Sequence, residues 1–583
     1  MRPEYEKRLK ERKLAADNQQ RRSHSLGTWR LIVFVAGALI AWWNYWFLPI
    51  PVAAFILLVV IHERTARKAA LAQRAIAFYE RGLSRLDGKW AGFGQTGDRF
   101  LDADHPYAAD LDVFGNGSLF QLVCAARTGA GEETLAAWLK FPAAEEVVPE
   151  RQAAVDELRP MLDLREEIAL LGEDIRSGLH AGALQRWGEA PPLKISGFHR
   201  AAVVLLSIFT TVSIAAYFLQ LLPLTPFLLG LLLEIALLMR IGPLLTQVFT
   251  GVELPASDLR LLADLLERFE REQFKAPMLV RLRSDLETDG LPASRRIAHL
   301  RKLVEYHDWG RNQAFAPIAF VLLWHAHLGF AVERWRVRSG PKIAEWLQSV
   351  GQIESLSSIA GYAAEHPEDV WPEITSTGSP LFDGDGITHP LLANGVRNDL
   401  VLSSDMRLLV ISGSNMSGKS TMLRSVGLNV VLAWAGMPVR ARKLRVSRLE
   451  VGASMRVQDS IQDGKSRFYA EITRLRHIMD LASAPIPLLF LLDELLSGTN
   501  SHDRAIGAEA IVTSLVKTGA IGLVTTHDLA LAGIASKLAP QAANVHFEDH
   551  VEQGRISFDY KMRTGVVEKS NALELMRSVG LEV

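Results

Sequence analysis

The stretch "ISGSNMSGKSTMLRSVG", residues 411–427, predicts a strand that ends in a glycine-rich loop and continues as a helix. Gly413 and Gly418, followed by Lys419 and Ser420, have the spacing of a phosphate-binding loop. In such a loop, backbone N–H groups at a helix N-terminus face phosphate oxygens, a lysine contacts the β- and γ-phosphates, and a hydroxyl reaches Mg²⁺. The pattern therefore predicts a site for ATP and Mg²⁺ built from Gly413, Ser414, Asn415, Met416, Ser417, Gly418, Lys419, Ser420 and Thr421.

Two further apolar segments end in polar residues that phosphoryl transfer requires. In "PIPLLFLLDELLSGTNSHD" (485–503) the apolar part ends at Asp493, which can hold Mg²⁺ through water, and Glu494, which can polarise the attacking water. "AIGLVTTHD" (520–528) ends at His527, whose imidazole can contact the γ-phosphate. A strand-end histidine on its own is more often structural, but beside the other motifs a catalytic role is favoured. We expect catalysis by Glu494 and His527, and metal binding by Ser420 and Asp493.

Four motifs follow one another in a recognisable order between residues 376 and 583. They are "GSNMSGKST", then "DSIQDGKSRFYAEI" (459–472) with Phe468 and Glu471, then "DELLSGTNSHD", and finally "TTH". This set resembles the ATPase domain of the MutS family of DNA mismatch-repair proteins, whose corresponding motifs read GPNMGGKST, DNI…G.STF..E, DE.GRGTST.D and ATH. The resemblance implies an α/β P-loop NTPase domain of the ABC type that hydrolyses ATP with Mg²⁺ and acts on double-stranded DNA.

The same resemblance implies a dimer. In the MutS family the ATPase domains pair, and the loop after the second carboxylate motif reaches the neighbour's nucleotide. Here that loop is "LLSGTNSHD" (495–503), whose small and polar residues suit close approach to a phosphate. The chain would then form a homodimer with two composite sites, to which Asn500 and Ser501 contribute.

Two departures from the family pattern bear on that site. The family's Arg-Gly-Thr-Ser is replaced by Ser497-Gly498-Thr499-Asn500, and the aromatic residue near the adenine is replaced by Gly395 or Val396. These changes put the contacts of the loop and the stacking of the base in doubt, but not the binding of phosphate.

A weaker resemblance continues upstream into a helical region. "GSLFQLVCAARTGAGEETLAAWLKFP" (117–142) looks like the family's core domain, and "DLRLLADLLERFERE" (258–272) has leucines at the spacing of an amphipathic lever helix. We find no counterpart of the family's mismatch-reading domain, with its Phe-x-Glu wedge, or of its connector domain. The sequence therefore predicts an all-α core and lever region before the ATPase domain.

Two long apolar blocks predict membrane-spanning hairpins. Residues 29–61 are too long for one span and fit two spans joined by "FLPIP", and residues 201–239 repeat this design. Lys and Arg residues flank both blocks, which predicts that both ends of each hairpin are cytoplasmic. We therefore expect a multi-pass protein of the cytoplasmic membrane, in contact with the lipid bilayer, whose ATPase domain faces the cytoplasm. The alternative is that the apolar helices are buried in a large soluble core, which is less favoured for the first block than for the second, where Glu234 lies inside.

Other features are less decisive. A net charge of −1 excludes a globally basic nucleic-acid coat, and the single cysteine, Cys124, excludes a disulfide framework. "FAPIAFVLLWHAHLGF" (315–330) is predicted to be a buried helix, with His325 and His327 in packing rather than metal binding.

A run of basic residues could meet DNA phosphates, although such a run is more often a solvated helix face. It comprises Arg281, Arg283, Arg295, Arg296, Arg301 and Lys302.

These observations predict six segments and three competing functions. The segments are a basic N-terminus (1–28), a first hairpin (29–62), a first helical part (63–200), a second hairpin (201–240), a second helical part (241–375) and the ATPase domain (376–583). The favoured function is a membrane-anchored MutS-like ATPase that hydrolyses ATP at a dimer interface and acts on DNA. The alternatives are an ABC-type ATPase that drives a membrane process without DNA, and a scaffold switched by nucleotide.

Overall fold

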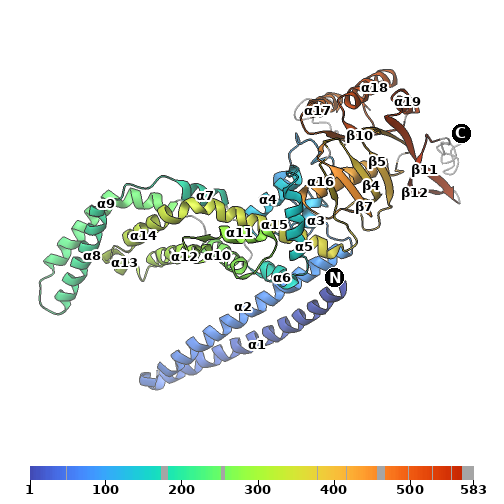
Figure 1. Cartoon of the computed structure of the whole chain (residues 1–583). Coiled ribbons are helices and arrows are strands. Elements are labelled where there is room, and N and C mark those ends of the chain that lie inside the picture. The colour runs from blue at the N-terminus through green and yellow to red at the C-terminus, as the bar shows by residue number, and fades with distance from the viewer. Residues whose placement is uncertain are drawn as a thin grey trace. The chain divides into compact units, whose positions relative to one another are not determined.

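The computed structural model divides the chain into two compact units. Residues 1–125, 135–169 and 356–583 form the first unit, and residues 126–134 and 170–355 form the second. Figure 1 labels most of the helices of both units and several strands of the first unit. The structure describes residues 1–47, 49–171, 181–250, 256–376, 378–414, 416–455, 467–496, 498–527, 529–552 and 555–567.

A six-stranded sheet in the order β12-β11-β6-β10-β9-β8 forms the centre of the first unit (Figure 1). β8, β9, β10, β6 and β11 run parallel to one another, and β12 pairs antiparallel with β11. Every residue of β6, β9 and β10 is buried, as expected for parallel strands covered on both faces. The bounds are β6 (Leu408–Ser412), β8 (Glu450–Ser454), β9 (Leu488–Leu492), β10 (Ile521–Thr526), β11 (Ala542–Glu552) and β12 (Arg555–Thr564).

Helices and a second sheet pack around this sheet. α17 (Arg467–Leu481), α18 (Ser501–Lys517) and α19 (Leu529–Lys537) contribute to one apolar cluster with β6, β9 and β10. α16 (Lys419–Ala435) follows β6 and is almost entirely buried. A four-stranded sheet has the order β3-β7-β4-β5, with β3 (Glu373–Thr375), β4 (Phe382–Ile387), β5 (Asn398–Leu402) and β7 (Lys443–Ser447).

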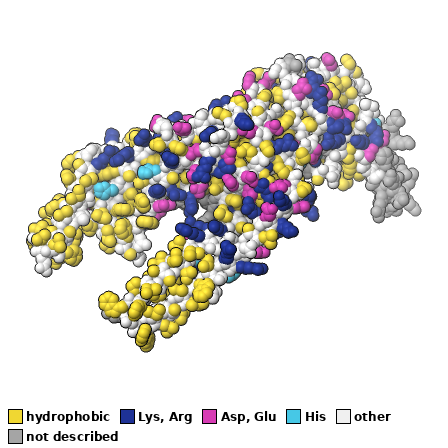
Figure 2. Space-filling view, turned by 60° about the horizontal axis from the view of Figure 1, so that its bottom comes forward, with side chains coloured by type: hydrophobic (Ala, Val, Ile, Leu, Met, Phe, Trp, Pro, Cys, Tyr) yellow, Lys and Arg dark blue, Asp and Glu magenta, His cyan; other side chains and the backbone are white. Residues whose placement is uncertain are grey.

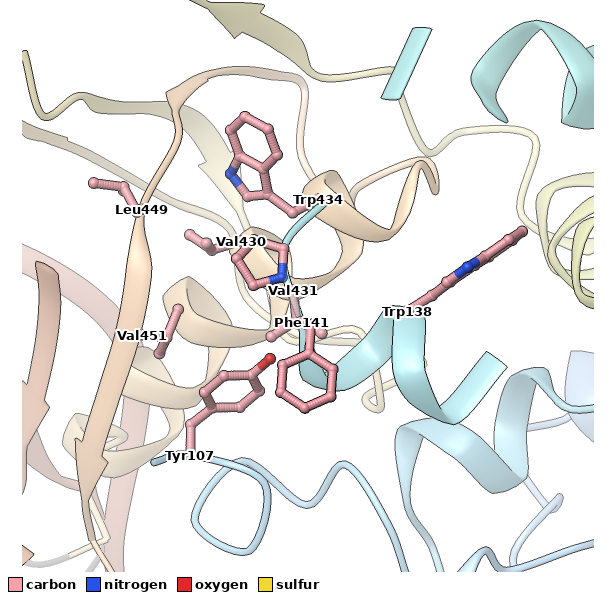
Figure 3. A pocket seen from close by; sticks show the side chains of 9 residues that line it. Tyr107, Trp138, Phe141, Val430, Val431, Trp434, Leu449 and Val451 are labelled. Atoms are coloured by element: carbon pink, nitrogen blue, oxygen red, sulfur yellow. The ribbon is translucent and has the colours of Figure 1, made fainter. Parts of the chain in front are cut away.

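Aromatic packing joins α16 to the C-terminal half of α4 (Gly129–Lys140). Trp434, Val430 and Val431 of α16 line a small pocket together with Tyr107, Trp138 and Phe141, and Figure 3 shows the Trp138 ring pointing away from the other side chains. The Tyr107 hydroxyl donates to the carbonyls of Leu139 and Lys140 at 2.9 and 2.7 Å, which fixes the end of α4. The space left between these side chains is about 10 Å³, no more than one water occupies. The contact is therefore packing and not a ligand site.

The first unit also contains two long helices that form an antiparallel hairpin. α1 (Arg2–Trp43) and α2 (Pro49–Leu86) are joined by a 3₁₀ turn (Tyr45–Phe47), so the basic N-terminus is the first part of α1. The predicted first apolar block forms only the far ends of these helices, where its large side chains are exposed. They include Trp29, Leu31, Phe34, Leu39, Trp42, Trp43, Ile50, Ile56 and Leu57.

Buried ionic contacts fasten the base of this hairpin to the rest of the first unit. The Glu365 carboxylate, which is fully buried, accepts hydrogen bonds from Arg85 at 2.5 and 2.6 Å and from the Tyr5 hydroxyl at 3.1 Å. The Glu166 carboxylate accepts from Tyr79 at 2.5 Å and from Arg12 at 2.7 Å. Each buried carboxylate thus has a cation and a phenol, which is what makes burial of its charge tolerable. The remaining helices here are α3 (Leu119–Val123), α5 (Val147–Leu158), α6 (Leu162–Leu170) and a 3₁₀ turn (Asp98–Phe100).

The second unit is helical apart from a short two-stranded ribbon. The helix predicted at 258–272 is present as α10 (Ala256–Arg271), whose Leu259, Leu262, Leu266 and Phe269 are buried. Helices α8 (Gly197–Phe218) and α9 (Thr225–Thr250) form the second apolar hairpin. The other elements are α7 (Ala181–Glu189), α11 (Pro277–Asp285), β1 (Glu287–Thr288), β2 (Leu291–Pro292), α12 (Ala293–Gly310), α13 (Ala316–Val321), α14 (Trp324–Ser339), a 3₁₀ turn (Gly340–Lys342) and α15 (Ile343–Glu365).

Residues 315–330 differ from the single buried helix that the sequence predicts. Leu323 has a left-handed backbone (φ 45°), which ends α13 and begins α14. Ile318 and Phe320 of α13 are exposed, whereas the part in α14 is largely buried. His325 contacts His307 at 3.0 Å and His327 contacts Ser207 at 3.4 Å. Over the described ranges no group of three or more His, Cys, Asp or Glu side chains could hold a metal ion.

Four helices of the described part of the chain are long and apolar enough to cross a membrane. They are α1, α2, α8 and α9, and little of their most apolar windows is buried against other parts of the protein. Figure 2 shows hydrophobic side chains covering the far ends of both hairpins.

Candidate functional site

The carboxyl ends of β6, β9 and β10 meet at one edge of the six-stranded sheet because these strands are parallel neighbours. The loop after β6 leads into the N-terminus of α16, Asp493 and Glu494 follow β9, and His527 follows β10. A cavity of about 580 Å³ lies at this edge, which is a volume typical of small-molecule sites. Six of the predicted residues line it: Met416, Gly418, Lys419, Ser420, Thr421 and Glu494.

Lys419 is held inside the loop that precedes it. Its side chain is buried, and its ammonium donates to the carbonyls of Gly413 and Ser414 at 2.8 Å each. Burial lowers the pKa of the Lys419 amine, and the neighbouring Glu494 and Asp493 carboxylates act in the opposite direction. The loop therefore presents a positive charge close to two carboxylates.

Two glycines of this loop are required by its backbone. Gly413 has φ 152° and Gly418 has φ 105°, where side chains are strained. A Cβ on Gly413 would lie 2.9 Å from the Phe547 carbonyl, and one on Gly418 would lie 3.1 Å from the Tyr560 ring. Tyr560 and Phe547 thus contact the loop directly, although neither was among the residues predicted for the site.

The two carboxylates are positioned by the neighbouring strand. The Thr525 hydroxyl of β10 donates to the Asp493 carboxylate and accepts from the Glu494 backbone N–H at 3.1 Å. His527 Nδ1 lies 3.3 Å from Glu494 Oε1, and this histidine is half exposed. Glu494 has a left-handed backbone (φ 50°), a strained conformation of the kind that clusters at functional sites. The structure therefore brings Asp493, Glu494 and His527 together as predicted from sequence.

The loop after β9 is held by α17. Glu471, which is buried, accepts from the Leu496 backbone N–H at 2.6 Å. A Cβ on Gly498 would lie 3.3 Å from Phe468, so this residue also packs against the loop. Phe468 and Glu471 of the second motif (459–472) thus support the loop that carries Asp493 and Glu494.

The opposite wall of the cavity comes from residues that the sequence did not single out. Thr388, His389 and Asn398 line it, together with Tyr560 and Phe547. The Asn398 amide donates to the Tyr560 carbonyl at 3.0 Å and accepts from the Met562 backbone N–H at 2.8 Å. Gly395 and Val396, the two candidates for the base-facing position, also lie in this wall. The sequence does contain a signal for His389, Asn398 and Tyr560. They belong to the segments "HPLL" (389–392), "NDL" (398–400) and "ISFDY" (556–560), which follow one another in the order seen in the MutS family.

The other predicted residues that the structure describes do not line the cavity. Asn500 caps α18, where its side chain accepts from the Asp503 N–H at 2.9 Å. The hydroxyls of Ser414 and Ser417 are buried in the loop, and neither has a hydrogen-bond partner within the described ranges. Asn415 lies outside the described residues, as do Ser497 and the side chain of Ser501, the first residue of α18.

A metal ion at this site would be coordinated by few protein ligands. Mg²⁺ is usually held by one or two protein oxygens, with phosphate oxygens and water completing its shell. Ser420 in the cavity wall and Asp493 at the end of β9 supply oxygens of the right kind. These residues fit Mg²⁺ bound together with a nucleotide.

Residues 409–582 match the family model described as MutS domain V. The chain is 36% identical over 257 residues to "DNA mismatch repair protein MutS 2" of Halobacterium salinarum, a match that covers 41% of this chain and 28% of that protein. It is 33% identical over 201 residues to "Endonuclease MutS2" of Thermus thermophilus, covering 33% of this chain and 25% of that protein. It is also 33% identical over 255 residues to "DNA mismatch repair protein MutS" of Natronomonas pharaonis, covering 41% of this chain and 28% of that protein.

The C-terminal part of the chain is thus a MutS-type domain V built on a largely parallel sheet. Through this domain the chain is related to proteins of the MutS family. The matches span about a quarter of the length of these relatives, so likeness to them concerns this part alone.

We predict that stability of the site falls as the pH drops below neutrality, through His389. Burial lowers the pKa of this imidazole to about 4, so the folded protein holds it neutral while the unfolded chain binds a proton near pH 6.5. This contribution to the free energy of unfolding is complete above pH 6.5 and is lost as the pH falls toward 4. At pH 5 the loss amounts to about 2 kcal/mol.

The control is His389→Asn, whose side-chain oxygen can still accept the Leu391 N–H that His389 Nδ1 accepts at 3.2 Å. Thermal unfolding measured by intrinsic fluorescence between pH 7.5 and 5 should show a steeper fall in Tm for the wild type than for this variant. Parallel curves for the two proteins would contradict the assignment.

Proposed function

We propose that this protein binds ATP with Mg²⁺ and hydrolyses it. The observation that carries the proposal is the position of Glu494, which lines the same cavity as Lys419 and lies 3.3 Å from His527. A buried cation, a carboxylate and an imidazole around one cavity are the groups that phosphoryl transfer uses, since this reaction depends on positioning and charge neutralisation.

The residues divide these tasks. Lys419 and the backbone N–H groups at the start of α16 bind the phosphates, and Glu494 orients and polarises the attacking water. The His527 imidazole contacts the γ-phosphate. Ser420 and Asp493 would hold Mg²⁺, which neutralises phosphate charge when bound.

Tyr560 is our candidate for the residue that stacks on the adenine base of ATP. Its side chain is 43% exposed and lines the cavity, whereas Phe547 is almost fully buried. Because Gly395 and Val396 offer no ring, Tyr560 supplies the aromatic face for stacking.

We predict opposite effects of two substitutions on nucleotide handling. Lys419→Ala removes the phosphate-binding cation and should abolish ATP binding. Glu494→Gln keeps the shape and hydrogen bonding of the side chain but cannot polarise water, so binding should persist while turnover falls by about 10²-fold or more. Equilibrium binding of a fluorescent ATP analogue and single-turnover hydrolysis measure the two steps. An equal loss of affinity in both variants would show that the roles are misassigned.

We further propose that both apolar hairpins lie in the cytoplasmic membrane and that the ATPase domain faces the cytoplasm. The four apolar helices α1, α2, α8 and α9 support this, since most of their large apolar side chains are exposed and only a small share of their most apolar windows is buried inside the protein. The basic residues that flank both hairpins support the orientation. The second hairpin agrees with this placement because Glu234 is its single acidic residue and is fully buried.

The site is proposed to be shared between two chains of a homodimer. Support comes from Thr499 and Asn500, two polar residues of the loop after β9 that do not line the cavity of their own chain and lie at the N-terminus of α18. A helix N-terminus of this kind attracts phosphate. Membrane anchoring would raise the effective concentration of the two domains.

We predict that two inactive chains complement one another. Asn500→Asp keeps the cap of α18, because aspartate is as good an N-cap as asparagine, but it places a negative charge toward the partner's phosphate. Mixing it with Lys419→Ala leaves one intact site in each heterodimer, so a random equimolar mixture should recover about a quarter of wild-type turnover. Full activity of the Asn500→Asp homodimer, or no recovery in confirmed heterodimers, would refute shared sites.

The proposal that this ATPase acts on duplex DNA rests on the names of its relatives, "DNA mismatch repair protein MutS 2" among them. The basic run at 281–302 adds little support. Arg296 is buried in hydrogen bonds within its own unit, Arg283 donates to the Glu270 carbonyl, and Arg301 pairs with Glu305.

We predict that duplex or branched DNA accelerates ATP hydrolysis by the detergent-solubilised full chain several-fold, and that rising salt suppresses the effect. The matched control is the Glu494→Gln chain with the same DNA, which should stay inactive. If DNA of either kind leaves the rate unchanged at low salt, an ABC-type engine for a membrane process without DNA, or a nucleotide-switched scaffold, takes the place of this proposal.

A further inference from the structure

The α1–α2 hairpin has a fixed register that brings basic residues of both helices to one level. The rings of Phe34 and Phe55 lie 6.2 Å apart, and Ser23 contacts His62 at 3.4 Å. Nearer the base, Lys13 pairs with Glu80 at 2.9 Å. Between the last two contacts both helices carry exposed basic residues. They are Arg21 and Arg22 on α1, with Arg64, Arg67 and Lys68 on α2, and we call these five residues the basic girdle.

The basic girdle carries an excess of positive charge that the protein does not neutralise. All five side chains are exposed. Arg67 pairs with Glu63 at 2.5 Å, whereas in the described part of the chain no carboxylate lies within ion-pair distance of the other four. Charges of one sign at this density repel one another unless a counter-charge lies close by. The girdle therefore fits an acidic partner.

The distance from the basic girdle to the tip of the hairpin matches the thickness of a bilayer. From Arg22 to Trp43 the helix rises about 32 Å, and from Pro49 to Arg67 about 27 Å, against a hydrocarbon core of about 30 Å. Trp42, Trp43 and Trp46 at the tip are exposed, as interfacial tryptophans are. When the tip lies at one interface, the girdle lies at the other.

We propose that the basic girdle binds the headgroups of anionic phospholipids in the cytoplasmic leaflet. The proposal rests on the membrane insertion proposed above and adds to it the class of lipid that the hairpin recruits. Figure 2 shows Lys and Arg side chains beside the apolar end of this hairpin, toward its base. Basic residues directly next to a membrane segment gather acidic lipids because the charges lie within a Debye length of the headgroups.

Duplex DNA is the competing acidic partner, and the position of the girdle favours lipid. The five cations lie on both helices of a two-helix rod, level with the end of its apolar part, so headgroups reach them wherever the hairpin is inserted. DNA at this level would have to lie against the membrane surface, which carries the same negative sign as its phosphates.

The test compares two variants with the same change in charge. Arg21→Gln/Arg22→Gln/Lys68→Gln removes three cations of the girdle, and Lys7→Gln/Lys10→Gln/Arg81→Gln removes three exposed cations near the base of the same hairpin. Each full-length chain is reconstituted into nanodiscs of phosphatidylcholine with a minor fraction of phosphatidylglycerol. Lipids that remain bound are counted by native mass spectrometry, and binding of duplex DNA is measured in detergent.

We expect phosphatidylglycerol to be enriched around the wild type and the base variant, and the enrichment to fall several-fold in the girdle variant while insertion into pure phosphatidylcholine is unchanged. Equal enrichment in both variants overturns the lipid proposal and leaves membrane insertion intact. Loss of DNA affinity in the girdle variant with lipid enrichment unchanged overturns it in favour of DNA. Failure of the wild type to enter nanodiscs of any composition overturns membrane insertion, and this proposal with it.

Discussion

The parallel pairing of β6 with β10 and of β10 with β9 is the constraint on which the site depends. Because all three strands end at one edge, residues more than a hundred positions apart come within contact distance. The Thr525 hydroxyl shows how close the dependence is, since one side chain of β10 holds both the Asp493 carboxylate and the backbone of Glu494. A slip of one residue between β9 and β10 would turn these groups to the other face of the sheet.

A continuous series of contacts links this edge to the base of the α1–α2 hairpin. Asn429 of α16 accepts from the Arg440 backbone N–H at 2.7 Å, and the Arg440 guanidinium pairs with Asp369 at 3.0 Å. Asp369 follows the C-terminus of α15, where Glu365 binds Arg85 of α2. All of these residues belong to the first unit, so the hairpin and α16 are connected by one set of buried polar contacts. Removing one partner of a buried ion pair costs about 3–5 kcal/mol, so we expect substitutions along this series to destabilise the first unit.

The sequence predicts those parts of the site that lie in one continuous motif. Gly413, Gly418 and Lys419 are close in the chain, and their spacing alone specifies the turn and the helix that follows. Tyr560 and His389 could not be found in this way, because their place in the cavity wall depends on how β12 and the segment before β5 pack. Apolar runs likewise predict both hairpins but not the length of α1, since its first 28 residues mix charges of both signs and show no periodic apolar face. Nor did composition predict the left-handed Leu323 that divides residues 315–330 into two helices.

The account centres on an ATP-hydrolysing MutS-type domain carried by a membrane-embedded chain. The most direct test is ATP hydrolysis by sealed membrane vesicles after an alkaline carbonate wash, compared between inside-out and right-side-out preparations that carry the wild type or Glu494→Gln. The account predicts Glu494-dependent hydrolysis that survives the wash, occurs in inside-out vesicles without detergent, and appears in right-side-out vesicles only after they are permeabilised. Hydrolysis that leaves with the wash, or that is the same for the wild type and Glu494→Gln, would contradict it.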